Sequence, residues 1–254
     1  MMGYDKKFYR NQRVNNLQSA KIIVPIVLDF IRGVSMDTIP SIIDLGCGSG
    51  NWLSVFKEQG CYVRGVDFGD IPIETLMIKQ SEYVRHDLSQ KYTDKRKYTL
   101  SMSLECAEHI SRANAEAMVS TLMELSNIVL FSAAIPHQRG RGHINEQYQS
   151  YWIDFFDKRG YQVFDIIRSQ VWNNNEVRGF YAQNMFLFVN RNCNEYSRLS
   201  CTLRDWPEIP FDIIHPEIWE QVNGYKFVKM MDRMHDNRIV SWIYYSFIKY
   251  SKRH

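Results

Sequence analysis

The sequence predicts an α/β protein with a Rossmann-like, mostly parallel sheet and helices on both of its faces. Short apolar runs alternate with stretches of roughly 8 to 15 residues whose apolar positions recur at helical spacing, which is typical of repeated β-α-β units. The first apolar run, residues 41–45, leads directly into a glycine-rich turn. Glycines at such a place allow the tight turn between a buried strand and the helix that follows it.

The predicted elements follow in a regular order. A helix is expected over residues 14–32, where Pro25 marks a kink or a break, after a loosely held arm over residues 1–13. Strands are expected over 41–45, 61–67, 82–86, 98–104, 128–134, 161–167 and 184–189. Further helices are expected over 51–59, 113–126 and 148–159, and one or two helical turns over 71–79. Because no clear helical pattern separates the last two strands, we expect them to pair antiparallel at one edge.

Composition and charge exclude several classes of protein. The chain has 254 residues, 45% of them apolar, so it is too apolar for intrinsic disorder. Its 31 Lys and Arg against 28 Asp and Glu give a formal net charge of +3, which argues against a strongly polyanion-binding protein.

The 5 cysteines form no C-x-x-C pair, so we expect reduced thiols and a cytoplasmic protein. We expect neither a signal peptide nor a membrane span, because the polar N-terminus has no apolar core and no apolar run reaches a bilayer's thickness.

The most informative motif is the glycine-rich turn, Asp44-Leu45-Gly46-Cys47-Gly48-Ser49-Gly50. Its spacing is D-x-G-x-G-x-G and not the G-x-G-x-x-G of dinucleotide-binding proteins. A carboxylate at residue 44 suits a ligand with an ammonium or sulfonium group better than one with a phosphate. Asp67 ends the next predicted strand, where a carboxylate can accept both hydroxyls of a ribose.

With this motif the sequence resembles the class I S-adenosylmethionine-dependent methyltransferases over most of residues 40–190. The resemblance implies a seven-stranded sheet whose last strand is antiparallel, with S-adenosylmethionine as cofactor and S-adenosylhomocysteine as product. Because the alternation of strands and helices stops beyond Arg191, we expect an N-terminal arm and helix (1–39), the cofactor-binding domain (40–190) and a C-terminal helical extension packing on the core (191–254). The residues it assigns to the cofactor are Asp44, Gly46, Cys47, Gly48, Gly50, Asp67, Phe68, Asp87, Leu88, Leu104 and Glu105.

A second, narrower resemblance concerns the regions after the fourth and fifth predicted strands. Residues 104–110, L-E-C-A-E-H-I, are similar to the L-E-V-x-E-H-L signature of one bacterial methyltransferase subgroup. The F-S-A-A-I-P run at 131–136, the G-H-I-N-E-Q run at 142–147 and Tyr151-Trp152 are similar to the same subgroup. This subgroup is often associated with polysaccharide and glycolipid biosynthesis. The resemblance therefore implies O-methylation of a sugar hydroxyl in a glycan, a polysaccharide precursor or a related small molecule.

Two histidines are the candidates for proton removal from such a hydroxyl. His109 follows the fourth strand, at the sheet edge where open α/β sheets bind ligands, and a neutral imidazole is a suitable base near pH 7. Glu105 and Glu108 are close to it in sequence and are the candidates to orient it or raise its pKa, and His143, after the fifth strand, is the alternative base. Asn145, Glu146 and Tyr148 are the candidate acceptor-binding residues. These imidazoles and carboxylates could also hold a divalent metal, but no spacing motif requires one, and we expect none. We expect Trp152 to be a core residue.

Other functions remain open at this point. The acceptor could be another small metabolite, a natural product or a protein side chain, and we expect no nucleic-acid acceptor, because no N-P-P-Y or D-P-P-Y run is present. An NAD-dependent oxidoreductase and a non-catalytic methyltransferase-like partner are less favoured alternatives.

The basic, aromatic tail over residues 238–254 is expected to cover its own fold or a dimer partner. Peripheral contact with the inner face of a membrane is the alternative for that tail, and the oligomeric state stays open.

Overall fold

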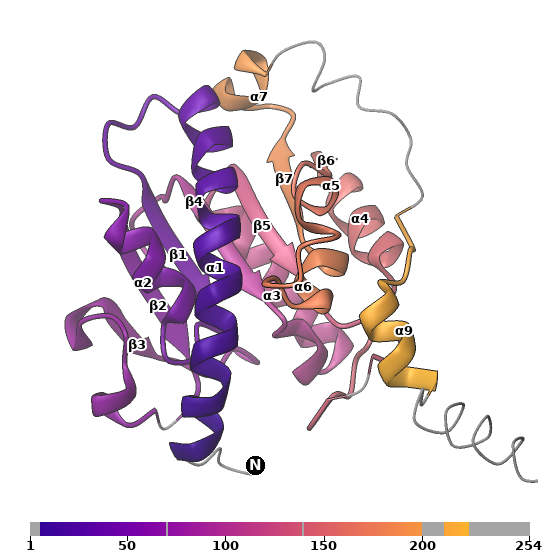
Figure 1. Cartoon of the computed structure of the whole chain (residues 1–254). Helices are drawn as coiled ribbons and strands as arrows, with labels where there is room; N and C mark the ends of the chain where they lie inside the picture. Colours follow the sequence, from indigo (N-terminus) through magenta and orange to yellow (C-terminus); the bar gives the residue numbers. More distant parts are fainter. Residues whose placement is uncertain (1–5, 70, 139, 200–210, 224–254) are drawn as a thin grey trace, which may run out of the picture. The chain divides into compact units, whose positions relative to one another are not determined.

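Figure 1 shows the computed structural model of the chain, which describes residues 6–69, 71–138, 140–199 and 211–223. The chain divides into two compact units, residues 1–215 and 216–254. The first unit contains the sheet. The described part of the second unit is one helix, α9 (Pro216–Asn223).

The sheet has seven strands in the order β3-β2-β1-β4-β5-β7-β6. The strands are β1 (Ser41–Leu45), β2 (Tyr62–Asp67), β3 (Tyr83–Arg85), β4 (Leu100–Leu104), β5 (Ile128–Ser132), β6 (Tyr161–Phe164) and β7 (Phe186–Asn190). The pairs from β3 to β5 are all parallel, whereas β7 runs antiparallel to both β5 and β6. The predicted seven-stranded, mostly parallel sheet with an antiparallel last strand is therefore confirmed.

Helices cover both faces of this sheet (Figure 1). The helices in the described residues of this unit are α1 (Lys6–Val34), α2 (Asn51–Glu58), α3 (Arg112–Leu125), α4 (Gln149–Asp157), α5 (Arg168–Val171), α6 (Gly179–Asn184) and α7 (Asn194–Arg198). The same residues also form the 3₁₀ turns η1 (Ile73–Thr75), η2 (Gln80–Glu82) and η3 (Ala107–His109). One face packs against α1, α2 and α6, and the other against α3 and α4.

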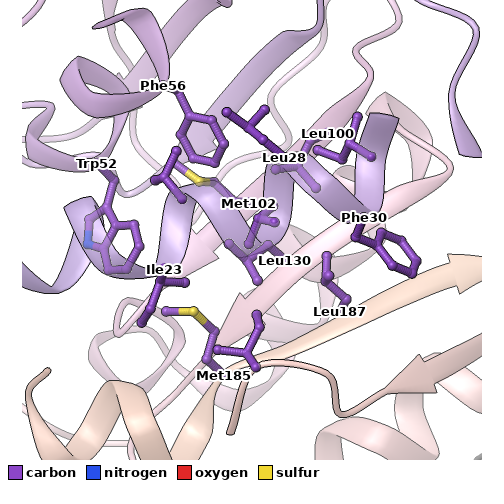
Figure 2. Packing of buried hydrophobic residues seen from close by; sticks show 14 of the residues in the cluster. Ile23, Leu28, Phe30, Trp52, Phe56, Leu100, Met102, Leu130, Met185 and Leu187 are labelled. Carbon is purple, nitrogen blue, oxygen red and sulfur yellow. The ribbon is translucent and has the colours of Figure 1, made fainter. Parts of the chain in front are cut away.

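The two cores follow from the alternation of side chains along buried strands. Leu130 points toward α1 and α2, while its neighbours Val129 and Phe131 point toward α3 and α4. Figure 2 shows the first of these cores, in which side chains from α1 and α2 meet those of β4, β5 and β7. Each fully buried large side chain there contributes roughly 1.5–3 kcal/mol by leaving water. Trp152 lies in the second core at 3% exposure, as the sequence predicts.

The N-terminal helix differs from the prediction. It begins at Lys6, so the expected loose arm is wrong over residues 6–13, and it continues through Pro25 without a break. Pro25 is exposed, so the carbonyl that loses its partner there can be hydrated. Ile23, Val24 and Val27 are fully buried on the other side of the helix. Their packing against the sheet outweighs the hydrogen bond that the proline removes.

After β2, the one or two helical turns predicted over 71–79 are present as the single 3₁₀ turn η1, and the rest of this segment is not helical. The backbone N–H of Met77 donates to the carbonyl of Ser49 over 2.8 Å. The side chain of Ile78 lies against Gly50 and Gly65. These tertiary contacts hold the segment extended across the glycine-rich turn, which a local pattern could not reveal.

Two short helices, α5 and α6, separate β6 from β7, where the sequence showed no clear helix. Within the described ranges, no helix is long and apolar enough to cross a bilayer. The described cysteines, Cys47, Cys61, Cys106 and Cys193, are free thiols. The tail over residues 238–254 lies outside the described residues.

Candidate functional site

The candidate residues gather at the carboxyl edge of the sheet, because the strands from β3 to β5 are parallel and their following loops emerge on one side. The strand order reverses between β1 and β4, which lie next to each other although β2 and β3 separate them in sequence. The helices that follow β1 and β4, α2 and α3, therefore lie on opposite faces of the sheet. Open α/β sheets bind their ligands in the crevice that such a reversal creates.

The glycine-rich turn after β1 is packed tightly against the loop after β4. Gly46 has φ +93°, and a Cβ built there would stand 2.4 Å from the Sγ atom of Cys106. The backbone N–H groups of Gly46 and Cys47 both donate to the carbonyl of Val66, over 2.8 and 3.3 Å. Only a residue without a side chain fits at position 46, so the turn lies directly against β2 and the β4 loop.

The carboxylate of Asp67 is fixed where β2 ends. Its Oδ2 accepts a hydrogen bond from the N–H of Gly48 and its Oδ1 one from the N–H of Gly69, each over 2.8 Å. Burial raises the pKa of this carboxyl, and the backbone donors at Gly69 and Gly48 oppose that rise. Each oxygen keeps further acceptor capacity. An oriented carboxylate that can accept two hydroxyl protons therefore lies beside the glycine-rich turn.

Asp44 is a second carboxylate at this turn, and it is 3% exposed. Its Oδ1 is buried and has no hydrogen-bond partner. Burial raises the pKa of this carboxyl well above its usual range, and the nearby charge of Asp67 raises it further. A buried oxygen without a partner is costly unless a ligand donates to it. The position therefore suits a ligand that carries N–H donors or a positive charge.

The remaining predicted cofactor residues lie close to these two carboxylates. Asp87 follows β3, beside Asp67, whose carbonyl accepts from the N–H of His86 over 2.9 Å. The N–H of Ser89 donates to Oδ1 of Asp87, which lowers the pKa of that carboxyl. The Cδ1 of Leu88 would lie 3.8 Å from a Cβ at Gly46. Cys47, Leu88 and Leu104 are buried, and Phe68 is 37% exposed.

Glu105 is held by an amide network that the sequence analysis missed. The Nε2 of Gln138 donates to its Oε2 over 2.7 Å, and the Nδ2 of Asn184 donates to its Oε1 over 3.2 Å. The Nδ2 of Asn184 also donates to the Oε1 of Gln138 over 2.9 Å. Burial raises the pKa of Glu105 to about 7 although these donors oppose the rise. Glu105 has φ +51°, an unusual backbone conformation for a residue with a side chain.

Neither amide could be found from a local motif. Gln138 lies in the loop after β5, and Asn184 ends α6, just before the antiparallel strand β7. Because β7 runs opposite to β5, the residues that precede it reach the carboxyl edge of the parallel strands. A polar residue at the end of a short, unrecognised helix gives no other signal in the sequence.

A second cluster joins the loops after β4 and β5 and consists of Glu108, His109, His143 and Glu146, which we call the Glu–His cluster. The Nδ1 of His143 lies 2.8 Å from Oε1 of Glu146, and its Nε2 lies 4.0 Å from Oε1 of Glu108. The rings of His109 and His143 meet edge to face, with centroids 4.8 Å apart. The structure therefore brings together both predicted histidines with Glu108 and Glu146.

The electrostatics of the Glu–His cluster are dominated by burial and by like charges. Glu108 is 1% exposed, and burial raises its pKa well above the usual range, with Glu105 adding to the rise. Partial burial of its ring lowers the pKa of His109, and nearby His143 lowers it further.

Backbone hydrogen bonds hold the two loops of the cluster together. The N–H groups of Ile144 and Asn145 both donate to the carbonyl of Glu108, over 2.8 and 3.1 Å. The side chain of buried Asn145 donates to the carbonyl of Ala107 and accepts from Gln147. Asn145 thus ties the loops together, whereas Tyr148, the other predicted acceptor residue, is 48% exposed.

The fold and the site together have the architecture of the Rossmann-like methyltransferases. A family model described as a methyltransferase domain matches residues 15–175. The chain therefore belongs to the methyltransferase domain family. No curated protein matches the sequence.

Solved structures share this fold at low sequence identity. Magnesium protoporphyrin IX methyltransferase from Synechocystis, solved with bound S-adenosylmethionine, is 19% identical with a TM-score of 0.51, covering 75% of this chain and 86% of its own. DesVI from Streptomyces venezuelae is 13% identical with a TM-score of 0.54, covering 72% and 95%. The amino pentose methyltransferase CalS10 from Micromonospora echinaspora, involved in calicheamicin biosynthesis, is 12% identical with a TM-score of 0.52, covering 75% and 99%. At these identities the likeness is one of fold.

Proposed function

We propose that this chain transfers the methyl group of S-adenosylmethionine to a hydroxyl group of a sugar or a glycan precursor. The observation that carries the proposal is the pair of carboxylates, Asp44 and Asp67, at the glycine-rich turn of a methyltransferase fold. Two of the similar structures have S-adenosylmethionine bound, according to their descriptions.

The residues at the turn fit this cofactor chemically. The unpartnered Oδ1 of Asp44 suits an ammonium or sulfonium group, and Asp67 offers two oriented acceptors for ribose hydroxyls. The lysine and arginine ion pairs of the described ranges involve other carboxylates, so the negative charge at the turn stays available for a cation. A pyrophosphate would be repelled there. Asp87 is then positioned for the adenine amino group and Gly46, Gly48 and Gly50 for the methionine part.

The chain's own residues have a limited chemical task. When bound, S-adenosylmethionine supplies a methyl group already activated by the positive charge on sulfur. The protein aligns the acceptor hydroxyl with that methyl group and excludes water. His109 or His143 would accept the hydroxyl proton through a ring nitrogen. The oxygens of Glu105 accept hydrogen bonds from Gln138 and Asn184, so its partners are these amides and not His109, which it was expected to orient.

A sugar acceptor is favoured by the groups on the acceptor side of the site. The Glu–His cluster offers carboxylate and imidazole groups, which hydrogen-bond to hydroxyls in both directions. Exposed Tyr148, beside Glu146, offers an aromatic face to a sugar ring. The described function of one similar structure, methylation of an amino pentose, agrees with an acceptor of this class.

Calorimetric titration of the purified protein with S-adenosylmethionine tests the cofactor. We expect a dissociation constant in the micromolar range, about −8 kcal/mol, and no binding of NAD. Asp67→Asn keeps the size of the side chain but removes its charge and one acceptor, and it should weaken binding at least tenfold. The matched control is Asp157→Asn, an exposed carboxylate at the end of α4. Binding of the Asp67 variant within twofold of the parent would show that the ribose assignment is wrong.

The acceptor requires a separate assay. Purified enzyme, labelled S-adenosylmethionine and a panel of sugars, nucleotide sugars and glycolipid precursors should give labelled product with at least one of them. The panel includes hydroxylated natural products and a denatured protein extract as competing acceptor classes. Label transfer only to protein would overturn the sugar assignment and leave the methyltransferase assignment intact.

A further inference from the structure

We propose that Glu108, His109 and His143 bind one divalent transition-metal cation of the zinc or manganese type. The inference that a cation binds here depends only on the chemistry and geometry of these three residues. Its role in the reaction, which is to hold the acceptor hydroxyl, rests on the proposed function.

The donor set is suited to such an ion. One ligand atom from each of the three residues lies within 4.8 Å of the others. Two imidazoles and a carboxylate are the ligands of many zinc sites that keep an open position for a substrate. With metal–ligand distances of about 2.0–2.2 Å, the ligand atoms of one ion come to lie roughly 3–4 Å apart. Small side-chain rotations would bring the three residues to this spacing.

The second observation is the buried, unpartnered oxygen of Glu108. This side chain is 1% exposed, and its Oε2 has no hydrogen-bond partner. Its Oε1 lies 4.0 Å from Nε2 of His143, beyond hydrogen-bond distance. A carboxylate in this state is costly to bury without a cation or a donor. A bound cation between Glu108 and His143 would supply the missing partner for both.

His143 is oriented as metal-binding histidines usually are. Its Nδ1 lies 2.8 Å from Oε1 of Glu146, and the Oε2 of Glu146 accepts from the backbone N–H of His137. A carboxylate on one ring nitrogen fixes the ring and raises the basicity of the other nitrogen, which faces the metal. Gly140 makes room for this ring, because a Cβ there would stand 2.1 Å from Nε2 of His143.

The three ligands come from two loops that are already joined. Glu108 and His109 lie in η3, and the loop that carries His143 donates two backbone hydrogen bonds to the carbonyl of Glu108. The cluster is therefore assembled before any cation binds. This reduces the entropy that binding would otherwise cost.

The cation would act on the acceptor rather than on the methyl donor. Coordination to a divalent metal lowers the pKa of a bound hydroxyl or water strongly. With the cation bound, His109 and His143 would act as its ligands, which replaces the role of base proposed for them above, and the acceptor hydroxyl would release its proton to solvent. A metal requirement for turnover is the consequence.

Binding is tested with Mn²⁺ alone. The metal-stripped protein is titrated with Mn²⁺, and electron paramagnetic resonance counts the free ion. We expect one bound ion per chain, displaced by Zn²⁺. Glu108→Gln and His143→Ala should each weaken binding at least tenfold, and the control Glu124→Gln, an exposed carboxylate on α3, should not. Binding of neither Mn²⁺ nor Zn²⁺, or equal binding in all variants, would overturn the proposal.

Spin-echo measurements on the parent protein keep the test independent of variant folding. Bound Mn²⁺ should show nitrogen couplings from the imidazoles, and their absence would also overturn the proposal. Failure of the metal proposal is distinguishable from failure of the proposed function. If turnover persists after chelators have removed the metal, only the metal proposal is contradicted. If the protein binds Mn²⁺ but does not bind S-adenosylmethionine, only the proposed methyltransferase activity is contradicted.

Discussion

Gly46 carries a conformational and a steric constraint at the same position. Its φ of +93° is costly for residues with a side chain, and its Cα lies so close to Cys106 that a Cβ would overlap the thiol. The first constraint shapes the turn, and the second brings the turn into contact with the β4 loop. Together they hold the turn that follows Asp44 against the loop that begins at Glu105.

Gly46→Ala should therefore destabilise the protein by more than the backbone strain alone. We expect a loss of more than 2 kcal/mol, against the 1–2 kcal/mol or so of a left-handed alanine. Gly60→Ala is the matched control, because Gly60 has φ +86° and a Cβ there would meet nothing within 4 Å. Urea unfolding of both variants measures the difference. Equal losses would mean that Cys106 yields without cost and that the close contact is not a constraint.

The residues of the candidate site differ in how well their positions could be predicted from the sequence. Asp44 and Asp67 could be predicted because each stands at a fixed place relative to a strand and a glycine turn, and local sequence determines both. Gln138 and Asn184, which hold Glu105, could not be predicted. They come from separate loops, and only the antiparallel pairing of β7 brings them together. A residue whose role depends on a distant partner leaves no local signature.

Among the elements, the N-terminal helix shows how packing outweighs local preference. Pro25 interrupts the hydrogen-bond ladder of α1, which nevertheless runs through 29 residues. Its buried stripe against the sheet, with Ile23, Val24 and Val27 fully covered, stabilises the helix on both sides of the proline. The strands were easier to predict, because each buried parallel strand is a short apolar run ending in a turn.

Replacing this proline should stabilise the molecule. Pro25→Ala restores one hydrogen bond, from residue 25 to the carbonyl of Lys21, and relieves the clash of the ring with that carbonyl. The cost of about 3 kcal/mol for an interior proline is partly offset by the freedom that alanine adds to the unfolded chain. We therefore expect a gain of about 2 kcal/mol. Thermal and urea unfolding measure it.

The control for this change is Lys21→Ala, which alters an exposed residue one turn earlier. It should change the free energy of unfolding by no more than about 0.5 kcal/mol. A Pro25→Ala variant no more stable than the parent would show that α1 is already distorted at this turn, so that the hydrogen bond is not recovered.

For the molecule as a whole, the strand order decides which distant segments form one site. The chain leaves β1 in one direction through β2 and β3 and then returns to place β4 on the other side of β1. This strand order brings the glycine-rich turn beside residues 105–109, although the two segments are far apart in the sequence. The class of fold could be predicted from the alternation of elements, and with it the edge at which the site lies. The contacts across that edge could not be, because they depend on side-chain packing between loops.

A ligand at this reversal point should therefore protect several distant segments at once. Hydrogen exchange is measured with and without S-adenosylmethionine at about 100 times its dissociation constant, where the bound state gains roughly 2.7 kcal/mol. We expect slower exchange in residues 46–50, 67–69 and 104–109, which follow β1, β2 and β4, and no change in β6 at the far edge of the sheet. NAD at the same concentration should protect none of them. Because local opening governs exchange in loops, protection confined to one of the three segments would mean that the cofactor does not bridge the reversal point.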